Sequence, residues 1–218
     1  MPEILTDIEA RVLGSLVEKQ LTTPENYPLT LNALLNACNQ KSNRDPVVSY
    51  DETTINQCLE NLRDRNLVYV FYGSTSRVPK YKHMVPSVYE LGPPETAVID
   101  VMLLRGPQTL GELRTRTERL YNFSGLGEIQ ETLDGLIRRD DPLVIKLPII
   151  AGQKEARFMH LASGQIDVEA FAAAQMTRAS RSSVDAERVE KLEEEVAGLR
   201  IEVESLKQTF DEFRKQFE

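Results

Sequence analysis

The sequence has few of the residues that build metal and redox sites. Its 218 residues include two cysteines and two histidines, too few for a four-ligand zinc site, and no C-x-x-C pair occurs. Cys38 and Cys58 each complete an apolar stripe at helical spacing, which predicts buried structural thiols. His83 and His160 fall at corresponding places in two separate predicted hairpins, so we do not expect them to share a catalytic site. We therefore expect no metal, no cofactor and no enzymatic activity.

Long apolar runs are also missing. No uninterrupted stretch approaches the ~20 residues that a membrane-spanning helix needs, and the first residues lack the basic start and apolar block of a secretory signal. The glycine cluster at residues 124–127 lacks the lysine of a phosphate-binding loop. These absences predict a cytoplasmic protein without membrane contact and without a nucleotide pocket.

Acidic residues exceed basic ones, but unevenly. The formal net charge is -8, from 26 Lys and Arg against 34 Asp and Glu. Residues 1–90 carry 9 basic and 11 acidic residues, residues 91–164 carry 9 and 10, and residues 165–218 carry 8 and 13. Because most of the excess acid lies in the last segment, the rest of the chain is nearly neutral and compatible with a nucleic-acid partner.

Two stretches of the chain follow the same plan. Apolar residues recur at helical spacing in residues 9–16, 30–38 and 55–62, and again in residues 95–102, 109–117 and 129–136. Capping boxes at Thr6–Glu9 and Ser49–Glu52 predict the starts of two helices in the first copy, and Thr30 is expected to cap another. Thr109–Glu112 marks a corresponding start in the second copy.

Each helical trio is followed by a pair of extended segments. Residues 67–72 and 80–85 flank one polar turn, and residues 143–150 and 156–161 flank another. Three helices and a hairpin are typical of a winged helix-turn-helix. The sequence therefore predicts an α+β, mainly α protein with two tandem winged-helix domains, residues 1–90 and 91–164, then a short helix and linker at 165–183 and a coiled-coil helix at 184–218.

One long run of residues is specific enough to indicate a family. The run TTPENYPLTLNALLNACNQKSNRDPV at residues 22–47, with LTDIEARVLGSLVEKQ before it, resembles the bacterial YceH family of proteins of unknown function. The resemblance covers roughly residues 4–162. It implies tandem winged-helix domains in a bacterial cytoplasm, and it brings no established catalytic or ligand residues.

The first copy holds the best candidates for DNA contact. In winged helices the third helix commonly enters the major groove, while the wing and a neighbouring turn hold phosphates. Tyr72 and Tyr81 interleave with the wing charges. The candidates are Lys41, Asn43 and Arg44 in the turn, Asn56, Gln57 and Asn61 on the helix, and Arg77, Lys80 and Lys82 in the wing.

Acidic residues on the same helices oppose this interpretation. Asp51, Glu52 and Glu60 lie on the first predicted recognition helix, and carboxylates repel a phosphate backbone. Arginines 114, 116 and 119 of the second copy are typical of a solvated helical face. The sequence thus favours a regulatory protein that binds double-stranded DNA, and the alternative is a protein-interaction or scaffolding module without DNA contact.

The last segment carries an apolar seam with alternating spacings of three and four residues. Valine at a positions with leucine at d positions favours a parallel two-stranded coiled coil, so we expect a homodimer. The alternative is one amphipathic helix that packs on its own chain. The expected dimerisation residues are Val189, Leu192, Val196, Leu199, Val203, Leu206, Phe210 and Phe213.

Overall fold

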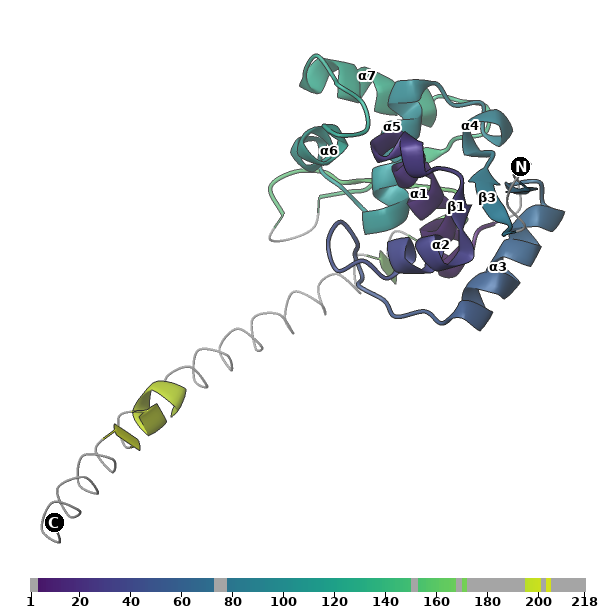
Figure 1. Cartoon of the computed structure of the whole chain (residues 1–218). Helices are drawn as coiled ribbons and strands as arrows, with labels where there is room; N and C mark the ends of the chain where they lie inside the picture. Colours follow the sequence, from purple (N-terminus) through teal and green to yellow (C-terminus); the bar gives the residue numbers. More distant parts are fainter. Residues whose placement is uncertain are drawn as a thin grey trace, which may run out of the picture. The chain divides into compact units, whose positions relative to one another are not determined.

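The computed structural model describes residues 4–72, 78–149, 153–167, 170–171, 195–200 and 203–204. The chain divides into two compact units, Met1–Ile166 and Asp167–Glu218. The first unit holds the elements from α1 to β5 (Figure 1). In the second unit, residues 195–200 and 203–204 are helical. The described chain is an α+β protein that is mainly helical, as the sequence predicted.

The first copy of the repeat comprises helices α1 (Asp7–Thr22), α2 (Leu31–Cys38) and α3 (Glu52–Asp64), a short 3-10 turn η1 (Pro24–Asn26), and strands β1 (Leu29–Thr30), β2 (Val68–Phe71) and β3 (Lys80–His83). A one-turn helix, α4 (Val85–Val88), follows. The second copy comprises α5 (Pro93–Arg105), α6 (Leu110–Thr117), α7 (Leu126–Ile137), β4 (Val144–Lys146) and β5 (Phe158–His160). The sequence predicted the helices and hairpin strands of each copy, but not η1, β1 or α4.

Polar caps start three of these helices where the sequence placed them, at Thr6, Thr30 and Thr109. The Thr6 amide donates to Glu9 Oε2 at 2.8 Å, and the Glu9 amide donates to Thr6 Oγ1 at 3.3 Å. Thr109 and Glu112 form the same reciprocal pair. The expected Ser49–Glu52 box was wrong, because the N-cap of α3 lies two residues later, at Asp51. Its Oδ1 accepts a hydrogen bond from the Thr54 amide at 2.7 Å.

The strand register shows how closely the two copies correspond. In the three-stranded sheet, with order β1-β3-β2, Leu29 pairs with Tyr81 and His83 pairs with Val68. In the two-stranded sheet Val144 pairs with His160, and an isolated bridge joins Gln108 to Phe158. Gln108 therefore takes the place of β1 in the second copy, directly before the cap of α6 as β1 lies directly before α2.

Helices α1 and α5 lie side by side at the centre of the unit (Figure 1). A Cβ atom built on Gly14 would lie 2.9 Å from Leu104 Cγ, so only glycine lets the two helices approach this closely. The apolar side chains of both copies join in one continuous hydrophobic core. As a result α1 is buried on all sides from Glu9 to Glu18, including the polar side chains of Arg11 and Ser15.

None of the helices in the described part of the chain combines the length and the apolar composition that a bilayer-spanning segment requires.

Candidate nucleic-acid interface

The outer face of the three-stranded sheet is aromatic and basic. Strand β2 alternates, so Val68 and Val70 face the core while Tyr69 and Phe71 are 55% and 52% exposed. Tyr69 lies opposite Lys82 in the register. Phe71 lies opposite Lys80. The four side chains therefore share one solvent-facing surface, which we call the hairpin face (Tyr69, Phe71, Lys80 and Lys82).

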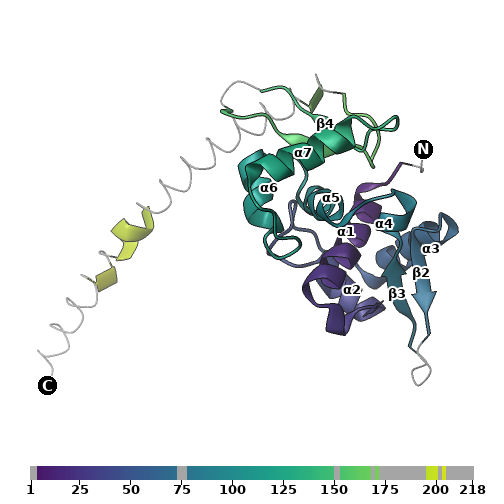
Figure 2. The ribbon, with the colours of Figure 1, turned by 90° about the horizontal axis from the view of Figure 1, so that it is seen from above.

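Helix α3 lies beside this hairpin (Figure 2). Of its predicted base-reading amides, Gln57 and Asn61 are exposed and Asn56 is half-buried. The Gln57 amide nitrogen lies 3.5 Å from both Glu60 Oε2 and Asn61 Oδ1, so these polar side chains lie along one face of the helix. The acids Glu52 and Glu60 are exposed on the same helix.

Of the two wing tyrosines, Tyr72 lies as the sequence predicted and Tyr81 does not. Tyr72 is 67% exposed, as expected of a side chain among the wing charges. Tyr81 instead faces the core, because its strand neighbours Lys80 and Lys82 take the outer positions. Burial raises the pKa of the Tyr81 hydroxyl, and the charges of Arg63 and Glu60 act on it from α3. Arg77 lies outside the described residues.

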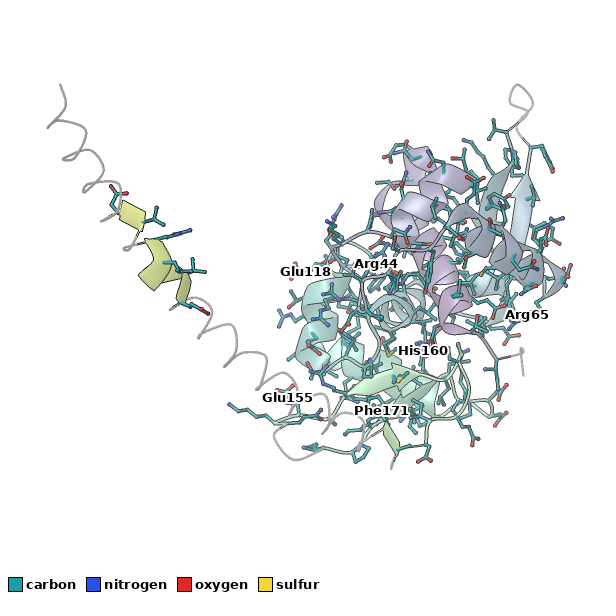
Figure 3. The ribbon with its side chains drawn as sticks, turned by 90° about the horizontal axis from the view of Figure 1, so that it is seen from below. Arg44, Arg65, Glu118, Glu155, His160 and Phe171 are labelled. Atoms are coloured by element: carbon teal, nitrogen blue, oxygen red, sulfur yellow. The ribbon has the colours of Figure 1, made fainter. Side chains whose placement is uncertain are left out.

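The turn between α2 and α3 contains one candidate that was wrong. Lys41 and Asn43 are exposed, and Asn43 Oδ1 accepts a hydrogen bond from Arg105 Nη1 at 2.9 Å. Arg44, expected to hold a phosphate, has a side chain that is 0% exposed. It therefore cannot reach DNA, and Figure 3 shows it within the body of the unit.

Arg44 belongs instead to a buried polar cluster between the two copies. Its guanidinium pairs with both carboxylate oxygens of Glu18, at 3.0 and 2.7 Å, and donates to the Ala37 carbonyl at 3.1 and 2.9 Å. Burial raises the pKa of Glu18, but the bonds to Arg44 outweigh it and the net pKa is lowered. Glu18 is thus an ionised carboxylate whose charge is matched.

Asp100 of α5 completes this cluster without a partner of its own. The residue is 1% exposed, and neither carboxyl oxygen has a hydrogen-bond partner among the described residues. Burial, reinforced by the charge of Glu18, holds the pKa of Asp100 well above its usual value. The raised pKa favours the neutral acid, which can donate a hydrogen bond.

Both cysteines and both histidines are buried. Cys38 and Cys58 are free and buried, as predicted, and burial raises their pKa values to about 11 and about 12. His83 and His160 occupy equivalent positions in the two hairpins and are both buried. Within the described ranges, no three His, Cys, Asp or Glu side chains are grouped as metal ligands.

Sequence reasoning overlooked two parts of this site. Tyr69 and Phe71 could have been assigned to the outer face, because the alternation of VYVF places them opposite the two valines. The burial of Arg44 and Asp100 had no sequence signal, since it depends on the packing of α1 against α5.

The described part of the second unit contains three of the eight expected dimerisation residues. Val196, Leu199 and Val203 are 47%, 54% and 49% exposed. The other five positions, Val189, Leu192, Leu206, Phe210 and Phe213, lie outside the described residues.

The fold and surface define a mainly helical α+β protein in which a duplicated helix-and-strand unit surrounds one core and exposes a basic, aromatic hairpin. The chain belongs to the family described as "Protein of unknown function, DUF480", whose model matches residues 5–153. It is 50% identical over 216 residues to a UPF0502 protein of Geotalea uraniireducens, covering 98% of both chains. A UPF0502 protein of Pelobacter propionicus is 48% identical over 222 residues, covering 100% of both chains. YceH proteins are this same group, so the family indicated by residues 22–47 is confirmed.

Proposed function

We propose that this protein is a non-enzymatic regulator that binds double-stranded DNA through the first copy of its repeat. The observation that carries the proposal is the hairpin face, where Lys80 and Lys82 stand next to exposed aromatic rings beside the exposed amides of α3. In the arrangement we propose, each copy is a winged helix, α3 is the recognition helix and the β2–β3 hairpin is the wing.

The division of charge between α3 and the hairpin sets the mode of contact. Amides such as Gln57 and Asn61 can hydrogen-bond to base edges in the major groove. The acids Glu52 and Glu60 on the same helix repel phosphates, so the phosphate contacts fall to Lys80 and Lys82. The few cations predict modest affinity with a shallow salt dependence.

The second copy lacks an equivalent surface among its described residues. Its register places Ile145 opposite Met159, so these apolar side chains take the positions that Tyr69 and Lys82 hold in the first hairpin. Helix α7 also carries Glu128 and Glu131. We therefore assign DNA contact to the first copy and a supporting role to the second.

We expect the double substitution Lys80→Ala, Lys82→Ala to weaken DNA binding about tenfold at moderate salt, and to reduce the slope of log K against log salt by about 2, because two phosphate contacts are lost. Fluorescence anisotropy with labelled genomic fragments across a salt series measures both quantities.

Lys146→Ala is the matched control, because Lys146 is an exposed strand lysine of the other hairpin. It should bind DNA as the unchanged protein does. Equal affinity of the double variant and the control, or no binding above a weak nonspecific level at low salt, would remove the DNA proposal.

We further propose that the C-terminal segment joins two chains as a parallel coiled coil. Val196, Leu199 and Val203 recur at spacings of three and four and are about half exposed in the single chain, so a partner helix would bury them. Two chains would present two DNA-binding copies, and weak individual contacts would then combine.

We expect Val196→Asp to convert the dimer to a monomer, because a carboxylate at a core a position would be buried without a partner. Ala197→Asp places the same charge one residue away, outside the seam, and should leave the dimer intact. Light scattering coupled to size-exclusion chromatography gives the masses. A monomeric unchanged protein, or a Val196→Asp variant that keeps the dimer mass, would contradict the proposal.

One observation favours a second function, the docking of another protein. Strand β2 lies at the edge of its sheet, and its exposed side chains Tyr69 and Phe71 are aromatic. Such an edge can accept an extended peptide as an added strand. Replacement of the hairpin lysines would leave this backbone pairing intact, so the lysine variant separates the two functions.

A further inference from the structure

A cavity of about 380 Å³ with both polar and apolar lining lies within the first unit, and most of its lining residues belong to the second copy of the repeat. Helices α1, α5 and α6 supply its walls, and Asn43 from the turn before α3 contributes to its rim. This volume is within the range of pockets that hold small molecules. The hairpin lysines do not line it, so it is separate from the proposed DNA interface.

Three arginines from α5 and the end of α6 line this cavity: Arg105, Arg116 and Arg119. Arg105 donates through Nη1 to Asn43, while its Nε is buried and has no hydrogen-bond partner in the part of the chain that the structure describes. Burial lowers the pKa of Arg105, and the charge of Arg116 lowers it further, while the charges of Asp45 and Glu112 act in the opposite direction and the net pKa is lowered. Arg119 is exposed.

The acids of the cavity do not neutralise these arginines. Glu18 is paired with Arg44 at 2.7 Å and with Lys19 at 3.2 Å. Asp100 is buried, neither of its carboxyl oxygens has a hydrogen-bond partner among the described residues, and burial holds its pKa well above the usual value. Glu118 is exposed, and Figure 3 shows it at the edge of the unit.

Among the described residues, Arg116 is paired with a single carboxylate, and a second arginine shares that carboxylate. Its Nη2 lies 3.5 Å from Glu112 Oε1, and Arg157 lies 2.8 Å from the other oxygen of the same carboxylate. Arg116 also bonds to the neutral side chain of Gln108. The wall formed by α5 and α6 therefore keeps an excess of positive charge around an open space.

We propose that this cavity binds a small organic anion, with its carboxylate or phosphate group held by Arg105, Arg116 and Arg119. An oxyanion between the two helices would offset the repulsion of Arg105 and Arg116 and give Arg105 Nε an acceptor. The apolar side chains of Val101 and Leu104, together with Thr22 and Thr115, would face the rest of the ligand.

Thermal unfolding of the full chain tests this proposal. The probes are inorganic phosphate, glucose 6-phosphate, succinate and citrate at millimolar concentration, with sodium chloride at matched ionic strength as reference. A ligand that binds only the folded protein raises the melting temperature. We expect one class of oxyanion to raise it above the chloride reference, and isothermal titration calorimetry then gives its dissociation constant. Comparison of the two phosphate probes with the two carboxylate probes shows which class of oxyanion binds.

Substitutions at the cavity distinguish a site from a general anion effect. We expect Arg105→Gln and Arg119→Gln each to weaken binding of the effective probe about tenfold, the order typical of a lost charge-assisted hydrogen bond. Arg119 is exposed, so its replacement is compatible with folding. Arg114→Gln is the matched control, because Arg114 is exposed on α6 and does not line the cavity.

The proposal is overturned if no probe exceeds the chloride reference, or if the cavity variants bind the effective probe as tightly as Arg114→Gln does. It does not depend on DNA binding. If the cavity variants lose probe binding but keep their DNA affinity, the result supports the anion site independently of the DNA proposal. Loss of DNA binding in the double lysine variant tests only the hairpin face.

Discussion

Replacement of Arg44 by methionine is expected to lower the free energy of unfolding by about 3 kcal/mol, because it leaves the buried Glu18 carboxylate without its main partner. The guanidinium makes two bonds to Glu18 and two to the Ala37 carbonyl, and its side chain is fully buried. Lys19 Nζ stays 3.2 Å from Glu18 and offsets part of the lost charge, which places the loss at the lower end for a broken buried pair. Urea unfolding followed by circular dichroism measures the change.

Two comparisons show whether the lost pair causes this effect. Lys41→Met removes an exposed cation from the same turn and should change the unfolding free energy by less than about 0.5 kcal/mol. The double variant Glu18→Gln, Arg44→Met removes the stranded charge and should be more stable than Arg44→Met alone. Equal stability of Arg44→Met and Lys41→Met would show that the buried pair contributes little.

The stabilising role of Arg44 follows from its position between the two copies. Next to it, the Asp45 amide donates to the Leu104 carbonyl of α5 at 3.0 Å. On its other side Asn43 accepts from Arg105. Residues 43–45 therefore hold the second copy against the first through hydrogen bonds. This part of the turn, which the sequence assigned to DNA contact, stabilises the packing of the two copies.

Acid is expected to destabilise the protein through its two histidines. Burial lowers the pKa of both His83 and His160 to about 4, and the charge of Lys82 adds to the shift at His83. The ordinary pKa of a histidine is 6.5, so the unfolded chain binds these protons first as the pH falls. Stability is then unaffected by them above pH 6.5 and decreases between 6.5 and about 4, by up to ~3 kcal/mol for each histidine.

Replacement of one histidine at a time separates the histidine contribution to the pH dependence of stability from that of the carboxylates. His160→Gln cannot take up a proton in this range, so the difference in unfolding free energy between pH 7 and pH 4.5 should be smaller than in the unchanged protein by up to ~3 kcal/mol. Urea unfolding at both pH values provides the comparison. His83→Gln should behave alike, since the two residues hold equivalent register positions. Parallel pH curves for variant and unchanged protein would show that the histidines are not kept neutral by burial.

Local sequence signals predicted much of the secondary structure because they act over a few residues. The Thr6–Glu9 and Thr109–Glu112 boxes satisfy helix amides within one turn, and the alternation in residues 68–71 is set by the strand itself. The predicted start of α3 at Ser49 was wrong, because two residues only two positions apart, Ser49 and Asp51, both have side chains able to cap a helix.

The sequence by itself therefore determined the duplicated order of helices and strands, the buried cysteines and the family, because periodicity, caps and a long specific run are written in neighbouring residues. Only the tertiary structure decided that Arg44 and Asp100 are buried and that a cavity opens between α1, α5 and α6. Those features depend on the contact of α1 with α5, which brings together side chains that are far apart in the chain. Helix α1 carries polar residues on one face, and the second copy covers that face, so the helix is buried on all sides from Glu9 to Glu18.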